Sequence, residues 1–312
     1  MSSTPPPKPG RSRASVIIAV LTCAIVAVSV FRYLAGNTTG RPAPTETGNP
    51  TPTSTLPRAR PAAEPAPSPI AARRAKPGKP PTGRAAAVSG PLYRLGRLPA
   101  VECRVEPFRA GDLASAKRHL HGLNGCLDRA WARQFREAGQ RFRAPSLKIV
   151  TKPVRSSCGW WVKDVAGTYC GSSRTMYILI DKDWLTDPGY LFPASVVAHE
   201  YGHHIQLLTG ISAYYDATFP PTKAGELALS RRFELQAECL AGVALSTVRA
   251  GLPIEDRRWQ ELLETTRESG DEAYKDNDHG KGANIARWLD RGYRSGAPSA
   301  CNTWTASKRS VG

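Results

Sequence analysis

The N-terminal third of this 312-residue chain is poor in acidic side chains, and its proline-rich part, residues 36–91, is also poor in large apolar ones. Only two of the first 91 residues are acidic, and residues 36–91 contain no aromatic residue. Such a segment cannot contribute to a core, so the composition excludes one globule built from the whole chain. The chain also lacks any Cys-x-x-Cys pair, which argues against a four-cysteine zinc site, and any tandem repeat of fixed period. Residues 92–312 leave room for one domain of roughly 200 to 220 residues.

The basic residues are concentrated in the same N-terminal third. The whole chain has 43 basic and 26 acidic residues and a net charge of +17. Residues 1–91 hold 12 basic and 2 acidic side chains, a charge of +10, whereas residues 92–312 hold 31 and 24, a charge of +7. A net charge that comes largely from a tail is no evidence for a basic groove on a folded domain. The net charge therefore does not indicate nucleic-acid binding, and we expect no nucleic-acid partner.

An uncharged apolar run, Val16–Phe31, follows a basic N-terminal start. With its flanks it forms a segment, 15–35, of about 20 residues, which is enough to cross a bilayer as one helix. Phe31-Arg32-Tyr33 lacks the small residues of a cleavage site, so we predict an uncleaved transmembrane signal anchor, with a cleaved signal peptide as the alternative. Basic residues favour the cytoplasmic side, so residues 1–14 form a cytoplasmic tail. We therefore expect a single-pass protein of the cell membrane with its folded domain outside the cytoplasm.

Residues 36–91 have the composition of a spacer. Their 13 prolines favour extended polyproline II and disfavour helix and sheet, so we predict a disordered Pro/Ala-rich basic linker. The alternative is that its basic side chains bind an anionic membrane or envelope polymer. These side chains are Arg58, Arg60, Arg73, Arg74, Lys76, Lys79 and Arg84.

Residues 92–312 have the pattern of a folded domain. Apolar residues at helical spacing predict a helix over 115–139, and β-branched and aromatic runs predict strands over 147–150 and 175–180. Three further helices are predicted near 193–209, 224–250 and 282–292. The expected fold class is α+β, helix-rich with a small sheet.

Six of the seven cysteines lie beyond the predicted anchor, which contains Cys23. An even number in an oxidising compartment suggests three disulfides, although six cysteines allow about 15 pairings. We favour Cys158–Cys170, because the loop between them is short and its flanks resemble strand ends. The pairs Cys103–Cys126 and Cys239–Cys301 then follow by elimination.

The segment His199-Glu200-Tyr201-Gly202-His203 contains the pattern His-Glu-x-x-His. Residues four apart on a helix lie one above the other, so His199 and His203 present both imidazoles to one metal ion. Glu200 is rotated by about 100° from His199, close enough to hold a metal-bound water without ligating the metal. His204 lies off the ligand face, and we interpret it as a packing or supporting residue.

A catalytic zinc ion needs a third protein ligand and an open fourth position. Glu234 and Glu238, again four apart, lie on the next long helix among apolar residues. Buried paired carboxylates require a cation or hydrogen-bond donors. We therefore predict Glu234 as the third zinc ligand and Glu238 as the acceptor of a hydrogen bond from a ligating imidazole. The alternative is that both carboxylates form salt bridges with Arg231 or Arg232.

These motifs resemble the neutral zinc metallopeptidase family of bacterial membrane proteins. The resemblance covers most of residues 110 to 304 in the expected order, although the family usually has Asp at the position of Glu238. It implies a zincin-like metallopeptidase fold with a glutamate as third ligand, as in the gluzincin group. The segments that carry it are His199–Gln206, Glu234–Gly242, Asp278–Gly280, Pro145-x-Leu147, Ser157–Gly159, Tyr169-Cys170 and Arg287–Tyr293.

His279 is the remaining histidine of interest. It precedes the start of the last predicted helix, where a loop could present its imidazole to the site. We take it as a candidate donor to the oxyanion of a tetrahedral intermediate, and the alternative is a surface histidine in a helix-capping loop. His119 and His121 are interpreted as structural.

Together these residues predict hydrolysis of a peptide or protein substrate by a zinc-activated water, with Glu200 as the general base. By analogy with zincins, the strand over 175–180 is expected to be the edge along which an extended peptide lies. Two alternatives are left open. One is a non-catalytic zinc-binding protein that interacts with the envelope, and the other is a zinc amidase that acts on cell-wall peptide.

Overall fold

The described residues of the computed structural model are 20–21, 81–160, 165–252, 254–273 and 278–312. All of them belong to one of the two units into which the chain divides. The predicted tail, most of the predicted linker and all of the predicted anchor except Val20 and Leu21 lie outside the described residues. Within the part that the structure describes, no helix combines the length and apolar character needed to cross a membrane. Val20 and Leu21, which the sequence analysis placed in a transmembrane helix, form a short strand instead.

Four strands form the main sheet in the order β1-β5-β6-β2. Their bounds are β1 (Val20–Leu21), β2 (Ser146–Val150), β5 (Val165–Cys170) and β6 (Thr175–Leu179). β5 pairs antiparallel with both β1 and β6, and β2 runs parallel to β6. β6 is therefore an inner strand, so the expectation that residues 175–180 form a substrate-binding edge is wrong. Separately, β3 (Arg155–Ser156) and β4 (Gly159–Trp160) form a small antiparallel pair.

Helices make up most of the described domain. They are α2 (Arg84–Ser89), α3 (Leu113–Glu137), α4 (Phe192–Leu208), α5 (Ile211–Ala217), α6 (Lys223–Val248), α7 (Asp256–Glu268), α8 (Gly282–Ser295) and α9 (Lys308–Val311). The short 3₁₀ helices are η1 (Pro91–Arg94), η2 (Lys182–Leu185) and η3 (Pro298–Cys301). Side-chain caps start the two longest helices: Asp112 accepts from Ser115 N at α3, and Thr222 accepts from Gly225 N at α6.

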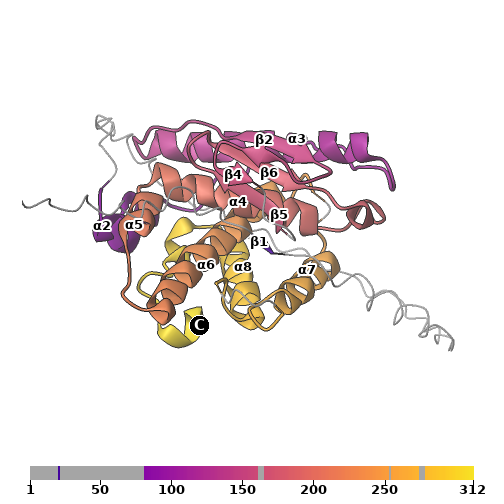
Figure 1. Ribbon diagram of the computed structural model, residues 1–312. Helices are drawn as coiled ribbons and strands as arrows, with labels where there is room; N and C mark the ends of the chain where they lie inside the picture. Colours follow the sequence, from indigo (N-terminus) through magenta and orange to yellow (C-terminus); the bar gives the residue numbers. More distant parts are fainter. Residues whose placement is uncertain (1–19, 22–80, 161–164, 253, 274–277) are drawn as a thin grey trace, which may run out of the picture. The chain divides into compact units, whose positions relative to one another are not determined.

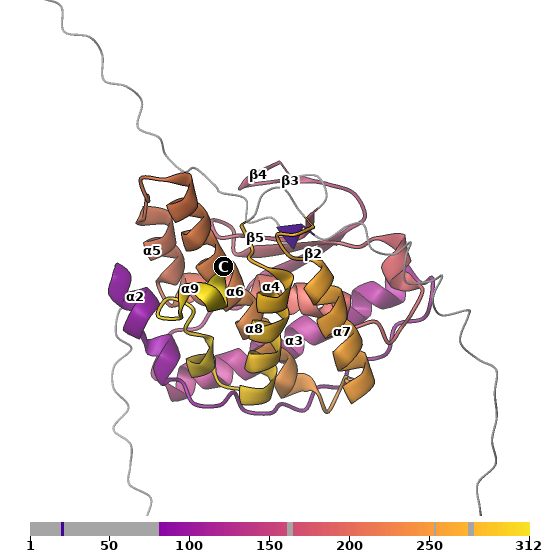
Figure 2. The ribbon, with the colours of Figure 1, turned by 90° about the horizontal axis from the view of Figure 1, so that it is seen from below.

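α4 is the central element of the fold. It contacts β5 and β6 on one side and packs against α6 on the other (Figure 1). α8 packs along α6, and α7 along α8, so these three helices cover α4 opposite the sheet (Figure 2). Every residue of α4 from Phe192 to Gln206 is buried. The polar side chains of this helix must therefore find their partners inside the domain.

The structure confirms the predicted class, a helix-rich α+β domain with a small sheet. The predicted helices correspond to α3, α4, α6 and α8, and the predicted strands to β2 and β6. β5 was not predicted, because all six of its residues are buried and its pattern does not alternate. α7 was also not predicted, although Trp259, Leu262, Leu263 and Thr266 have the spacing of a buried helical face.

The end of the predicted linker differs from the structure. Residues 84–91 were assigned to a disordered spacer, but α2 and η1 pack into the domain. Ala86, Ala87 and Leu92 have no exposed surface. Alanine contributes little to a compositional signal for a core, yet its small side chain allows close packing, so composition alone placed the boundary too late.

Three disulfides join distant parts of the domain, and all three predicted pairs are confirmed. Cys103–Cys126 fixes the segment before α3 to α3 itself. Cys158–Cys170 ties the β3–β4 pair to the end of β5. Cys239–Cys301 joins α6 to η3 near the C-terminal end of the chain.

Candidate metal centre

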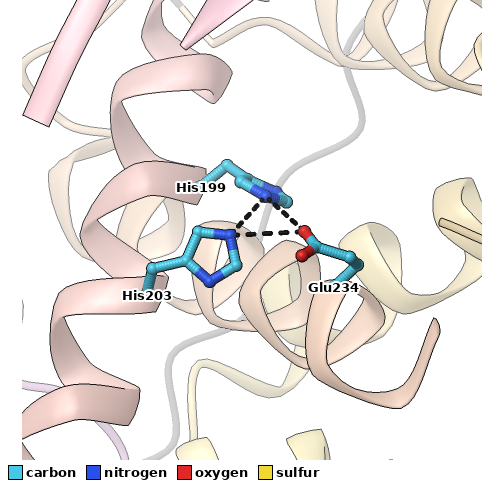
Figure 3. A group of neighbouring side chains, drawn as sticks. All are labelled: His199, His203 and Glu234. Carbon is cyan, nitrogen blue, oxygen red and sulfur yellow. Dashed lines mark hydrogen bonds and ion pairs between the residues drawn. The ribbon is translucent and has the colours of Figure 1, made fainter. Parts of the chain in front are cut away.

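His199 and His203 project from α4 toward one point (Figure 3). They lie one helical turn apart, and their Nε2 atoms are 3.1 Å from each other. Pro193 occupies the first turn of α4, where its missing N–H costs nothing, and Gly210 follows the helix in a left-handed conformation. Local sequence signals therefore set the two ends of this helix. The spacing of four residues then places both imidazoles on one face of it, as predicted.

Glu234 reaches the same point from α6 (Figure 3). Its Oε2 atom lies 3.3 Å from His199 Nε2 and 3.3 Å from His203 Nε2. The three candidate ligand atoms lie within 4.8 Å of one another, and all three residues are buried. The structure therefore brings together the three residues that the sequence analysis assigned to a metal ion.

Two hydrogen bonds turn the ligand atoms of both imidazoles toward this point. His199 Nδ1 lies 2.7 Å from Glu238 Oε2, and His203 Nδ1 lies 2.8 Å from Gln206 Oε1. A carboxylate and an amide oxygen accept hydrogen bonds, so each Nδ1 carries a proton, and each Nε2 offers its lone pair once a metal ion takes the place of any proton there. Glu238 thus has the supporting role predicted for it. Gln206 was not assigned a role, although its position three residues after His203 places it on a neighbouring part of the same helix face.

The charges around the ligand atoms favour a cation. Burial lowers the pKa of His199, but its hydrogen bonds with Glu234 and Glu238 outweigh burial and raise the pKa to about 10. Burial raises the pKa of Glu234, but the charges of His203 and His279 and two imidazole hydrogen bonds bring it below its usual range. Two imidazole lone pairs and a carboxylate oxygen that converge in this way fit a zinc ion.

Glu200 lies beside the ligands without joining them. Its side chain is fully buried, and neither carboxylate oxygen has a hydrogen-bond partner in the described structure. Burial is the main cause that raises its pKa to about 8. The backbone of β5 passes directly over it, since a Cβ on Gly167 would lie 2.8 Å from Glu200 Oε1. A buried, unpaired carboxylate with a pKa near neutrality suits proton transfer.

His279 approaches the same centre from the loop before α8. Its Nε2 lies 3.5 Å from Glu234 Oε2, and its Nδ1 lies 2.6 Å from Asp278 Oδ1. Burial lowers its pKa, but the charge of Glu234 and the contact with Asp278 outweigh burial and raise it. Its side chain is 16% exposed, so the alternative of a surface histidine does not hold. A pocket between α4, α6, α7 and α8 opens onto His199, Glu234 and His279.

The other histidines and the two arginines stand apart from the centre. His204 Nδ1 contacts the Tyr169 hydroxyl, so this residue packs against the sheet as interpreted. His119 Nδ1 contacts the Glu106 carbonyl, which agrees with a structural role. Arg231 pairs with Asp271 at 2.8 Å, and Arg232 donates to backbone carbonyls of the C-terminal segment. Imidazoles, rather than these arginines, face the carboxylates of Glu234 and Glu238.

An α+β domain with a His-Glu-x-x-His helix and a glutamate from a second helix defines a metal-binding domain of the zinc-hydrolase type. The chain belongs to the family described as "Putative neutral zinc metallopeptidase", which matches residues 115–304. This range includes all three ligands, and the family identifies the metal ion as Zn²⁺.

Relatives of this chain occur in Escherichia coli and in mycobacteria. The uncharacterized protein YpfJ of Escherichia coli K12 is 31% identical over 193 residues, which cover 57% of this chain and 67% of the relative. Uncharacterized proteins of Mycobacterium bovis and Mycobacterium tuberculosis are each 28% identical over 194 residues, which cover 53% of this chain and 64% of theirs. No solved structure matches this chain.

Proposed function

We propose that this protein is a zinc-dependent peptidase with a zincin-like site. The observation that carries the proposal is Glu200, a fully buried carboxylate next to the ligand His199 that has no hydrogen-bond partner among the described residues. A buried carboxylate without donors costs folding free energy, and such costs are typical of groups kept for chemistry. Its position supports the role of general base.

Each residue of the site has a separate role in the proposed hydrolysis. His199, His203 and Glu234 would hold the ion, which when bound supplies a Lewis acid for water and for the peptide carbonyl. Glu200 takes a proton from the attacking water and returns it to the leaving amine. His279 donates from Nε2 to the developing oxyanion, and Asp278 accepts from its Nδ1.

We further propose that this domain works outside the cytoplasm on a single-pass membrane anchor. Three disulfides support an oxidising compartment, and the uncharged run Val16–Phe31 supports an anchor, in which Val20 and Leu21 would lie in the bilayer instead of in β1. A peptide or protein is the substrate class that follows from the family.

The decisive comparison is wild type against Glu200→Gln, both as purified full-length chains. We expect each to bind one zinc ion, measured by metal analysis, because Glu200 is not a ligand. We expect wild type to cleave casein or members of a peptide library, and Glu200→Gln to lose roughly 10²- to 10⁴-fold of that activity, because it lacks the base.

Four results would contradict the proposal. If wild type binds no zinc, the assignment of the metal site is wrong. If Glu200→Gln keeps full activity, the assignment of Glu200 as the general base is wrong. Zinc binding without any cleavage of peptides would favour the non-catalytic alternative. Cleavage of cell-wall peptide at the amide that joins it to the glycan, with no cleavage of casein or library peptides, would favour the amidase.

A further inference from the structure

Asp271 lies in the turn after α7 and holds the loop that carries His279. One of its oxygens, Oδ1, accepts from His279 N at 3.1 Å and from Gly280 N at 2.9 Å. A third hydrogen bond joins the two backbones, because Asp271 N donates to Gly280 O at 2.9 Å. The loop therefore has three hydrogen bonds to a single residue of another segment.

Gly280 makes this arrangement possible. Its φ of +93° lies in the left-handed region, which side chains other than glycine rarely allow. This turn lets two successive N–H groups point at one oxygen atom. Two donors on one carboxylate oxygen form a small anion-binding concavity, and charge-assisted hydrogen bonds of this kind are stronger than neutral ones.

The second oxygen of Asp271 connects the loop to the helix that supplies the third ligand. Arg231 on α6 lies 2.8 Å from Asp271 Oδ2, and side-chain exposures of 23% and 9% place this ion pair largely away from solvent. Arg231 precedes Glu234 by one helical turn, and Glu234 Oε2 lies 3.5 Å from His279 Nε2. The contacts thus link Arg231, Asp271, His279 and Glu234, and the turn of α6 between Arg231 and Glu234 closes the ring. The ring sets the distance between the candidate oxyanion donor and the metal ligands.

We propose that Asp271 is a positioning residue, which with Arg231 fixes the backbone of His279 so that Nε2 points into the centre. The inference rests on the proposed function, since it assigns His279 a task in that reaction. Asp278 orients the ring through Nδ1, whereas Asp271 places the backbone from which the ring projects. A change at Asp271 alters catalysis only through His279.

This dependence is tested with a cycle of four full-length proteins: wild type, Asp271→Asn, His279→Ala and the double variant. We expect His279→Ala to lower kcat by roughly 10²- to 10³-fold, as for the loss of one oxyanion donor. We expect Asp271→Asn to lower kcat by roughly 10- to 100-fold, because small misplacements of catalytic groups have large effects. In the His279→Ala background, the same change should alter kcat less than about twofold. KM and zinc content should stay at the wild-type values throughout.

Two additional proteins and one binding measurement complete the test. Arg231→Gln should reproduce the pattern of Asp271→Asn without changing Asp271 itself. Glu264→Gln removes an exposed ion pair with Arg267 on α7 and should leave kcat unchanged. A phosphinic tripeptide, whose anionic oxygens imitate the tetrahedral intermediate, should bind roughly 10- to 100-fold more weakly to Asp271→Asn than to wild type, as judged by calorimetry.

The outcomes separate this inference from the proposed function. If wild type is active and Asp271→Asn keeps its kcat and its phosphinate affinity, the positioning role is wrong and the peptidase stands. If Asp271→Asn lowers kcat equally with and without His279, Asp271 acts through general stability and the inference is also wrong. If wild type neither cleaves peptides nor binds the phosphinate, the proposed function fails, and the role of Asp271 fails with it.

Discussion

Gln206 orients the ligand His203, and a chain of hydrogen bonds sets the orientation of Gln206 itself. The Trp304 indole can only donate, so Gln236 Oε1 accepts from it, at 3.1 Å. The same oxygen accepts from Gln206 Nε2, which leaves Gln206 Oε1 to accept from His203. The proton of His203 is therefore on Nδ1, and its Nε2 is free for the metal. A tryptophan near the end of the chain thus supports the tautomer of a ligand on α4.

Replacement of Gln206 by Leu tests this relay. We expect the change to leave His203 Nδ1 without an acceptor and to weaken zinc binding by roughly 10- to 100-fold, as is usual for groups that orient metal ligands. Competition with a chelator of known zinc affinity measures the change. Gln134→Leu is the matched control, since Gln134 is also buried and donates to the Gly96 carbonyl, but lies on α3 away from the metal centre. Equal zinc affinity in Gln206→Leu and wild type would contradict the relay.

At the scale of elements, the site depends on how closely α4 approaches α6. Gly202, between the two ligand histidines, faces Ala237, which lies between Glu234 and Glu238. A Cβ at residue 202 would lie 2.7 Å from Ala237 O and 2.9 Å from its Cα. These are backbone atoms, which cannot move aside as a flexible side chain can. The small residue lets Glu234 reach the imidazoles, so the distance between the helices is part of the ligand geometry.

Gly202→Ala should therefore separate α4 from α6. We expect a loss of about 1–3 kcal/mol in the free energy of unfolding, from overpacking, together with weaker zinc binding. Urea unfolding and metal analysis measure the two effects. Gly125→Ala on α3 is the control: its Cβ would meet nothing closer than an Arg129 side-chain nitrogen at 3.8 Å, so the change should stabilise the helix by about 0.5–1 kcal/mol. Similar stability changes in the two variants would show that the close approach is not limiting.

At the scale of the whole domain, segments remote in sequence are tied together around α6. The disulfide Cys239–Cys301 closes a loop of 62 residues, whereas Cys158–Cys170 closes one of 12. Gln236, one turn before Cys239, also donates to the Cys301 carbonyl and to the Tyr93 hydroxyl in η1. The N-terminal and C-terminal parts of the domain therefore meet behind the metal ligands.

The two loop lengths predict different contributions to stability. Replacement of both cysteines of Cys239–Cys301 by alanine should lower the free energy of unfolding by about 1.5 kcal/mol more than the same change at Cys158–Cys170. The reason is that a cross-link over a longer loop removes more conformational entropy from the unfolded chain. Urea unfolding of both double variants, each saturated with zinc, measures the difference. A larger loss for the short loop would contradict this account.

The sequence by itself determined the local part of the site. His199, Glu200 and His203 follow from the period of one helix, and the burial expected for the next helix identified Glu234 and Glu238. The three disulfides were also predicted, since Cys23 lies within the apolar run and six cysteines form three pairs. Only the tertiary structure decided which strand is inside the sheet, that α2 belongs to the domain, and where His279 points. It alone showed what orients Gln206 and what Asp271 holds. Gln206 is three residues from His203 on the same helix, but Gln236 and Trp304, which orient its amide, and the loop before α8, which Asp271 holds, are brought there by packing between distant segments, which no local pattern encodes.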